Sequence, residues 1–245
     1  MRDGFIGVID SGIGGISVLK ELSKLMPNEK YLYYGDNLNA PYGNRSQREL
    51  LSLAIKGVDK LKAFKIKALV VACNTLSVNL LEDIKHYSNV ATFGVFPPVE
   101  SCQIKKEKTL LLATAKTAKK YIPSENLHVV SLLNAVSEIE ANALNTSLIN
   151  FSKELRDNSV GCFIDEKGYY KNVILGCTHY NFIKNQIFDH FRPQKMFGGE
   201  LFTAKLVSKY LQSKKSLVNY KRNQILFIGE SAKINSIIYN VSGQN

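Results

Sequence analysis

Apolar residues in the first half of the chain gather in short runs of strand length, and each run ends in polar or glycine-rich positions. These runs are residues 5–9, 31–34, 68–72 and 90–95. Between the runs, apolar residues recur at spacings of three and four, as at Val18, Leu19 and Leu22. That is the period of a helix with one buried face, and strands that alternate with such helices predict a parallel sheet.

The second half of the chain repeats this order of elements. Its predicted strands are residues 109–113, 128–132, 173–176 and 195–197, followed by one more at 225–228. A long helical region is expected from Glu138 through Leu155, and shorter helices are expected around residues 182–191 and 204–211. The repetition favours two similar α/β halves.

The halves also match in the spacing of their strand ends. Asp10 precedes Cys73 by 63 positions, and Thr114 precedes Cys177 by the same number. Pro97-Pro98 interrupts regular structure between the halves, and the last part of the chain is too short for a third domain. We therefore predict a first α/β domain of residues 1–96 with 207–245, and a second of residues 97–206.

Composition adds limits on the class of protein. The 245 residues are 45% hydrophobic and 22% charged, as in an ordinary folded protein. Apolar runs stay far below the roughly 18–20 residues of a membrane span, and residues 5–9 are too few for a signal-peptide core. The four cysteines (73, 102, 162 and 177) form no Cys-x-x-Cys pair and no metal-ligand spacing. We expect free thiols, no bound metal, no membrane contact and a cytoplasmic protein.

The net charge of +11 raises the question of nucleic-acid binding. Lysines cluster around residues 60–67, 105–108 and 116–120, but no nucleic-acid-binding module accompanies them. We interpret most of these lysines as solvated surface. Their field also gives a general attraction for an anionic substrate.

The candidate catalytic residues follow the ends of two of the apolar runs. Cys73, Asn74 and Thr75 follow the run 68–72, and Cys177, Thr178 and His179 follow the run 173–176. Open α/β sheets carry their sites at the carboxyl ends of parallel strands, so both triplets are placed for function. One buried cysteine is commonly inert, whereas two in matching positions favour a shared role.

Two opposed thiols suit proton transfer at carbon. A thiolate is a base, a thiol is an acid with an ordinary pKa of about 8.5, and a helix amino terminus favours the thiolate. If two such domains face each other across a cleft, one thiolate removes a proton while the opposite thiol donates one. The carbon is thereby inverted, and no metal or cofactor is required.

The glycine-rich segment Asp10–Gly15 follows the first predicted strand and precedes a helix. That arrangement is typical of anion binding by backbone N–H groups. Its spacing differs from Gly-x-Gly-x-x-Gly, and the Asp10 carboxylate would repel a pyrophosphate, so we do not predict a dinucleotide site. A tight strand-to-helix turn that needs glycines is the structural alternative.

Taken together, four segments resemble those of the glutamate racemases, cofactor-independent members of the aspartate/glutamate racemase superfamily. The segments are residues 7–15, residues 34–36 with 41–43, residues 72–75, and residues 176–179. The resemblance implies two doubly wound α/β domains facing each other across a cleft that holds the active site. It also implies interconversion of L- and D-glutamate, which supplies D-glutamate for peptidoglycan, without a cofactor. We expect a homodimer.

The resemblance also implies residue roles. Cys73 and Cys177 would each deprotonate one enantiomer, with Asp10 assisting Cys73 and His179 assisting Cys177. Residues of the matching segments would bind substrate, and Thr117 would add to them. The predicted substrate-binding set is Asp10, Ser11, Pro41, Tyr42, Gly43, Asn74, Thr75, Thr117, Thr178 and His179.

The second half departs from the family pattern. The family has a proline-containing segment that ends in a catalytic glutamate, and residues 131–140 lack those prolines. Glu138 aligns best as this glutamate, Glu140 is the second choice, and an exposed helical glutamate is the structural alternative. Asn37 and Asn39 replace the threonine and arginine more usual in the family.

Three alternatives remain at this point. An aspartate racemase would keep both cysteines and differ in pocket size. A decarboxylase of the superfamily needs one cysteine and is disfavoured by the presence of two. A binding protein on the same fold would show salt-dependent binding and no turnover.

Overall fold

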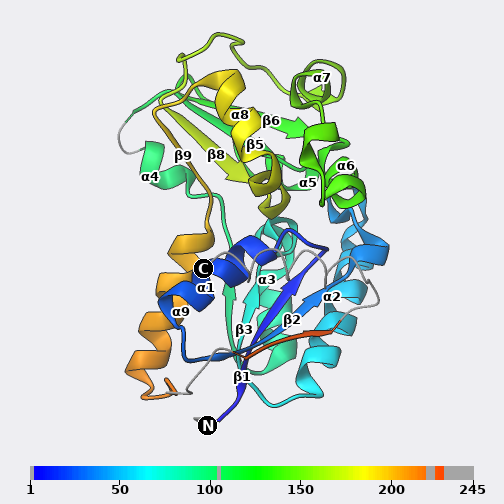
Figure 1. Cartoon of the computed structure of the whole chain (residues 1–245), viewed down its shortest axis with the longest axis vertical. Coiled ribbons are helices and arrows are strands. Elements are labelled where there is room, and N and C mark those ends of the chain that lie inside the picture. The colour runs from blue at the N-terminus through cyan, green and yellow to red at the C-terminus, as the bar shows by residue number, and fades with distance from the viewer. Residues whose placement is uncertain (1–2, 104–105, 219–223, 229–245) are drawn as a thin grey trace. The chain divides into compact units, whose positions relative to one another are not determined.

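The nine predicted strands and one short additional strand form two separate five-stranded sheets in a computed structural model, which describes residues 3–103, 106–218 and 224–228 (Figure 1). The chain divides into two compact units. Unit 1 contains residues 1–95 and 200–245, and unit 2 contains residues 96–199. Helix α9 (Glu200–Ser213) thus lies wholly in unit 1, whereas a boundary at 206/207 would cut it.

The sheet of unit 1 is parallel throughout, with strand order β10-β2-β1-β3-β4. Its strands are β1 (Phe5–Asp10), β2 (Lys30–Gly35), β3 (Ile66–Val71), β4 (Ala91–Gly94) and β10 (Gln224–Ile228). β1 lies at the centre, and its residues are buried from Ile6 onward. Strands covered on both faces read as continuous apolar runs, which is why their positions could be predicted.

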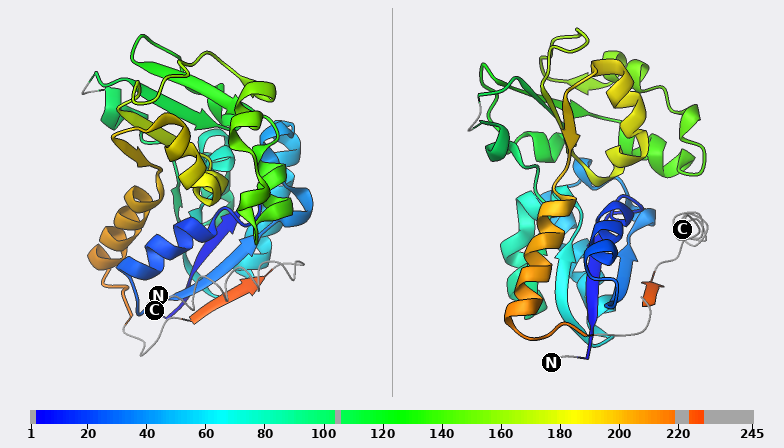
Figure 2. Two further views of the ribbon diagram at one scale, coloured as in Figure 1. Left: turned by 45° about the horizontal axis from the view of Figure 1, so that its top comes forward. Right: turned by 60° about the vertical axis from the view of Figure 1, so that its left-hand side comes forward.

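Helices cover both faces of this sheet. They are α1 (Ile16–Leu25), α2 (Gln47–Lys62), α3 (Asn74–Ser88) and α9. The chain runs from β1 to β2, then reverses across β1 to β3 and β4. Because parallel crossovers are right-handed, the reversal puts α2 and α3 on the face opposite α1. α9 packs beside α1 (Figures 1 and 2).

Helix α2 starts where the sequence places a cap. The Ser46 hydroxyl accepts a hydrogen bond from the Glu49 backbone N–H at 3.2 Å, and the Glu49 carboxylate accepts one from the Ser46 N–H at 2.8 Å. This reciprocal pair is a capping box. It fixes the point at which the loop 36–46 enters the helix.

The sheet of unit 2 has strand order β7-β6-β5-β8-β9. Its strands are β5 (Thr109–Ala113), β6 (Leu127–Leu132), β7 (Ser159–Val160), β8 (Asn172–Gly176) and β9 (Lys195–Phe197). The four predicted strands pair in parallel, and β7 adds an antiparallel edge that the sequence pattern does not indicate. Two residues are too few to show a period.

The helices of unit 2 are mostly short. They are α4 (Val99–Gln103), α5 (Ala115–Ala118), α6 (Ala135–Asn142), α7 (Phe151–Asp157) and α8 (Lys184–Phe191), with 3₁₀ turns η3 (Thr146–Leu148) and η4 (Thr178–Ile183). The predicted long helix through residues 138–155 is wrong, because α6 ends at Asn142 and α7 begins after Asn150. Asparagine and threonine compete with the backbone for hydrogen bonds, and the Asn150 side chain caps α7 by accepting from the Lys153 N–H at 3.0 Å.

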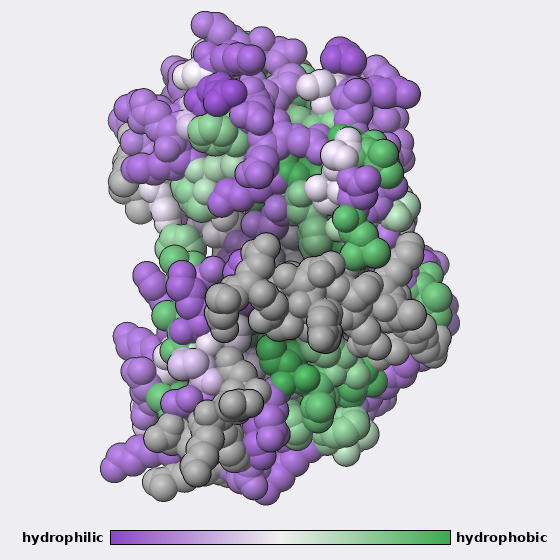
Figure 3. Space-filling model, in the orientation of Figure 1, coloured by the Kyte–Doolittle hydropathy of each residue, from purple (hydrophilic) through white to green (hydrophobic). Residues whose placement is uncertain are grey.

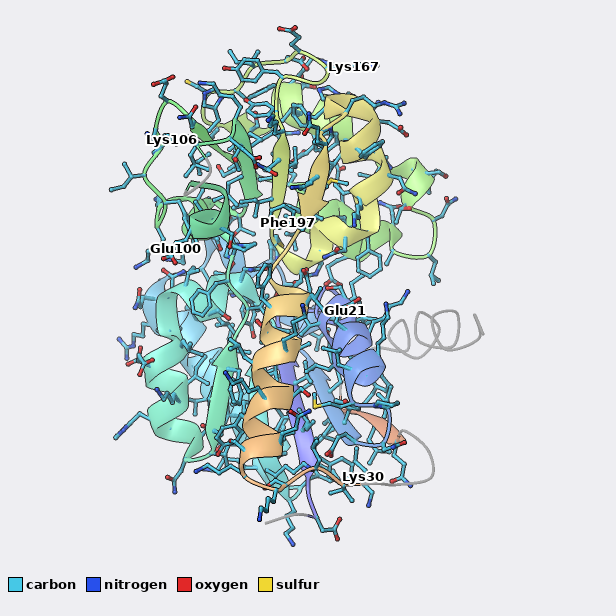
Figure 4. The ribbon with its side chains drawn as sticks, turned by 90° about the vertical axis from the view of Figure 1, so that its left-hand side faces the viewer. Glu21, Lys30, Glu100, Lys106, Lys167 and Phe197 are labelled. Atoms are coloured by element: carbon cyan, nitrogen blue, oxygen red, sulfur yellow. The ribbon has the colours of Figure 1, made fainter. Side chains whose placement is uncertain are left out.

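Hydrophilic residues predominate on the face of unit 2 seen in Figure 3, and the labelled Lys106 and Lys167 in Figure 4 lie on exposed loops. Within the described ranges, no helix is both long and apolar enough to cross a membrane.

Candidate active site

The first half-site lies at the carboxyl edge of the unit 1 sheet. β1 and β3 are neighbouring strands in which Ile9 pairs with Val71, so Asp10 and Cys73 emerge beside each other. Both residues are buried, and Cys73 precedes the first turn of α3. Its sulfur lies 3.6 Å from Ser11 Oγ. The predicted Asp10, Ser11 and Cys73 therefore gather at one edge.

The glycine-rich segment is a tightly packed turn. Asp10 Oδ1 accepts a hydrogen bond from the Gly12 N–H at 2.9 Å, and the Tyr33 hydroxyl donates to the Gly12 carbonyl at 2.6 Å. A Cβ at Gly15 would lie 2.7 Å from Asp10 Cβ and 2.8 Å from the Tyr33 hydroxyl. Gly15 is thus required for close packing, and the Asp10 carboxylate occupies the turn, which agrees with the absence of a dinucleotide motif.

Asp36 organises the loop that carries Pro41, Tyr42 and Gly43. Its carboxylate accepts hydrogen bonds from the Tyr42 hydroxyl at 2.7 Å and from Asn39 Nδ2 at 2.9 Å. Burial, followed by the bond to Asp36, raises the pKa of the Tyr42 phenol far above its ordinary value. Tyr42 is therefore a neutral donor. Asp36 was not among the predicted site residues, although its position directly after a predicted strand was the available signal.

Asn74 and Thr75 form the first turn of α3 and are buried. Asn74 Nδ2 donates to the Val95 carbonyl at 3.0 Å, which ties the start of α3 to the chain after β4. The Thr75 carbonyl accepts from Asn79 Nδ2 at 2.8 Å. Both predicted residues thus lie beside Cys73 in a fixed backbone.

The second half-site is built in the same way in unit 2. β5 and β8 are neighbouring strands in which Ala113 pairs with Gly176, so Thr114 and Cys177 emerge at one edge. Thr114 Oγ1 donates to Thr117 Oγ1 at 3.1 Å, and Thr117 and Thr178 are buried. The predicted Thr117 and Thr178 therefore accompany Cys177.

A chain of polar contacts runs through His179, which is 1% exposed. His179 Nδ1 lies 3.8 Å from Cys177 Sγ, and His179 Nε2 lies 2.6 Å from Glu140 Oε1. Burial of the imidazole lowers its pKa, but the hydrogen bonds to Cys177 and Glu140 outweigh burial, and the pKa of His179 is raised well above its ordinary value. The imidazolium form is favoured between a thiol and a carboxylate.

The glutamate at His179 is Glu140 and not Glu138. Both glutamates are partly buried on α6, and Glu140 is the one whose carboxylate meets His179 Nε2 at 2.6 Å. Alignment without the family's prolines could not separate two glutamates two positions apart, but a helix turns them to different faces. Among the residues that the structure describes, no three His, Cys, Asp or Glu side chains gather as metal ligands.

These observations define a class: an α/β protein of two units, each with a buried thiol at the carboxyl edge of its parallel sheet. A glutamate racemase of Clostridium acetobutylicum is 34% identical over 247 residues of alignment, covering 94% of this chain and 89% of that relative. The chain belongs to the glutamate racemase family, a family of isomerases. No family model matches the chain.

Solved structures give the same result. The glutamate racemase isoform RacE1 of Bacillus anthracis has a TM-score of 0.80 and 25% identity, covering 100% of this chain and 96% of that one. A glutamate racemase of Francisella tularensis, solved in complex with D-glutamate, has a TM-score of 0.75 and 25% identity, covering 98% and 94%.

Proposed function

We propose that this protein interconverts L- and D-glutamate by moving a proton at the α-carbon between two cysteines, without a cofactor. Family membership supports the substrate. The observation that carries the mechanism is the matched pair of buried thiols, Cys73 after β3 and Cys177 after β8. Each follows a strand beside the central strand of its own sheet.

In the proposed reaction the two half-sites act on one glutamate from opposite faces. The thiolate on one face takes the α-proton, and the thiol on the other face gives a proton to the carbanion. Asp10 and Ser11 serve Cys73, and His179 with Glu140 serves Cys177. A thiolate beside an imidazolium is a stable ion pair, so His179 is suited to hold Cys177 ready as the base.

The carbanion is the energetic difficulty of this reaction. The proposed reaction uses no cofactor to delocalise the charge of the carbanion. Fixed donors must therefore stabilise the substrate carboxylate as negative charge develops there. Candidate donors are the backbone N–H groups around Ser11 and Gly43, and the hydroxyls of Thr75, Thr117 and Thr178. Exclusion of water strengthens each of these interactions.

We further propose that the reaction supplies D-glutamate for peptidoglycan in the cytoplasm, and that the protein is a homodimer. An aspartate racemase would keep both cysteines and differ in pocket size. The substrate is therefore tested with both amino acids.

The test is exchange of the α-proton in deuterated water, followed by NMR, with L- and D-glutamate and no added cofactor. We expect inversion with deuterium incorporation from both enantiomers. Exchange with aspartate alone would make aspartate the substrate and leave the two-cysteine mechanism in place. Absence of exchange with either amino acid would contradict racemisation.

Single cysteine variants test the two thiols. Cys73→Ser and Cys177→Ser should each lower racemisation by about 10²–10⁴-fold, the usual contribution of one acid–base group. Each variant should still exchange the proton of one enantiomer without inverting it, and the favoured enantiomer should differ between the two. The exposed Cys162→Ser is the control and should keep full activity. Near wild-type turnover in either active-site variant would disprove the two-base scheme.

A further inference from the structure

Glu154 is a buried carboxylate that the proposed reaction does not use. It lies on α7 and is 2% exposed. Its Oε1 accepts a hydrogen bond from the Asn134 backbone N–H at 2.8 Å, and its Oε2 accepts one from Asn158 Nδ2 at 2.9 Å. Burial raises the pKa of Glu154, and these two hydrogen bonds oppose that rise. Because a buried carboxylate is costly unless it is hydrogen-bonded, its placement requires a structural account.

The Glu154 carboxylate supplies the cap of α6. Asn134 is the residue before the helix, and its own side chain makes no capping hydrogen bond. The first N–H groups of a helix have no partner within it, and a negative charge beside them is stabilising. The Asn134 N–H at the start of α6 is such a donor, and the Glu154 carboxylate is its partner. The Asn158 carbonyl accepts from the Leu133 N–H at 2.9 Å and anchors the preceding residue.

Helix α6 carries Glu140 to His179. Glu140 is five residues, about one and a half turns, beyond the first helical residue Ala135. α6 packs against η4, the turn that contains His179. A helix of eight residues is not stable alone, so its position depends on the contacts that fix its ends and its buried face.

We propose that Glu154 is a positioning residue for the His179–Cys177 pair: by capping α6, it fixes the place at which Glu140 meets His179. The path runs from Glu154 to the start of α6, along the helix to Glu140, and from Glu140 to His179. Its effect on turnover rests on the proposed racemisation. Its effect on His179 does not.

The kinetic test uses Glu154→Gln and Glu154→Ala, with Asp157→Asn as the control on the same helix at an exposed position. Small displacements of catalytic groups cost much rate, so Glu154→Ala should lower kcat about tenfold or more while KM changes less than about threefold. Glu154→Gln keeps one acceptor oxygen for the helix and should lose less. Asp157→Asn should match the wild type.

The second readout is the titration of the His179 ring by NMR in the folded protein. The chain has four histidines, so the ring signals can be assigned by single replacements. Because the bond to Glu140 raises the pKa of His179, loosening Glu140 should lower that pKa toward its value in Glu140→Gln. A role confined to stability would leave the titration of the folded protein unchanged.

A double variant completes the test. Residues that act through one path are non-additive, so adding Glu154→Ala to Glu140→Gln should lower kcat by less than about twofold further. The proposal is overturned if the losses multiply, or if both Glu154 variants are less stable yet keep the wild-type kcat and His179 titration. Should Glu154→Ala fail to fold, Glu154→Gln gives both readouts. A wild type without racemisation refutes the proposed function, and the His179 titration still decides the positioning role.

Discussion

At the scale of single residues, His179 links the protonation of the site to folding. Its pKa is raised in the folded protein, so the folded state binds the proton more tightly than the unfolded chain does. The resulting stabilisation is fully present below the ordinary histidine pKa of about 6.5 and is lost as the pH rises through the higher folded value. The cause is the Glu140 carboxylate and the Cys177 sulfur on either side of the ring.

We predict that His179→Gln destabilises the protein more at pH 6 than at pH 9.5, by an amount on the order of 1–3 kcal/mol for a charge-assisted hydrogen bond. Urea unfolding across this pH range measures the difference. His86→Gln, at an exposed position on α3, is the matched control and should show little difference. A His179→Gln effect that is independent of pH would contradict a raised pKa.

Among the site residues that stand directly after a strand, the sequence identified both thiols and His179 but passed over Asp36. Cys73, Cys177 and His179 could be placed because an apolar run shows where a parallel strand ends. Asp36 and Glu154 act through hydrogen bonds that depend on how a loop or a second helix folds back. No local pattern reports such a contact, and the choice between Glu138 and Glu140 depended on the same kind of information.

At the scale of elements, the capping box of α2 connects a loop of the candidate site to a stable helix. We predict that Ser46→Ala lowers the free energy of unfolding by about 1 kcal/mol, because the Glu49 N–H in the first turn of α2 loses its hydrogen-bond partner. Ser52→Ala is the control, since Ser52 is exposed on the same helix. Urea unfolding at one pH suffices, and equal stabilities of the two variants would argue against the cap.

Elements with a clear apolar pattern were predicted well, and the short elements of residues 135–160 were not. Apart from β7, the strands of both sheets have clear apolar patterns, as do helices α1, α2 and α9, so their existence followed from the sequence. The region 135–157 divides into α6, η3 and α7 because asparagine and threonine side chains compete for backbone hydrogen bonds near residues 142–150. Such competition is decided by the local fold rather than by periodicity.

At the scale of the whole molecule, the net charge of +11 has a measurable consequence for an anionic substrate. We predict that kcat/KM for glutamate falls by a few-fold when NaCl rises from about 50 to 500 mM, because salt screens the long-range attraction. The value of kcat at saturating glutamate is the internal control and should stay constant. If kcat/KM is independent of salt, the lysines contribute only solvation.

The two thiols have different neighbours: Ser11 lies beside Cys73, whereas His179 and Glu140 lie beside Cys177. Mirror-image substrates have the same free energy in water, so the equilibrium constant between them is one. For an enzyme that interconverts them, thermodynamics then requires the same kcat/KM in both directions. The unequal neighbours therefore cannot bias the final mixture. They can only make one enantiomer saturate the protein at a lower concentration and turn over proportionately more slowly.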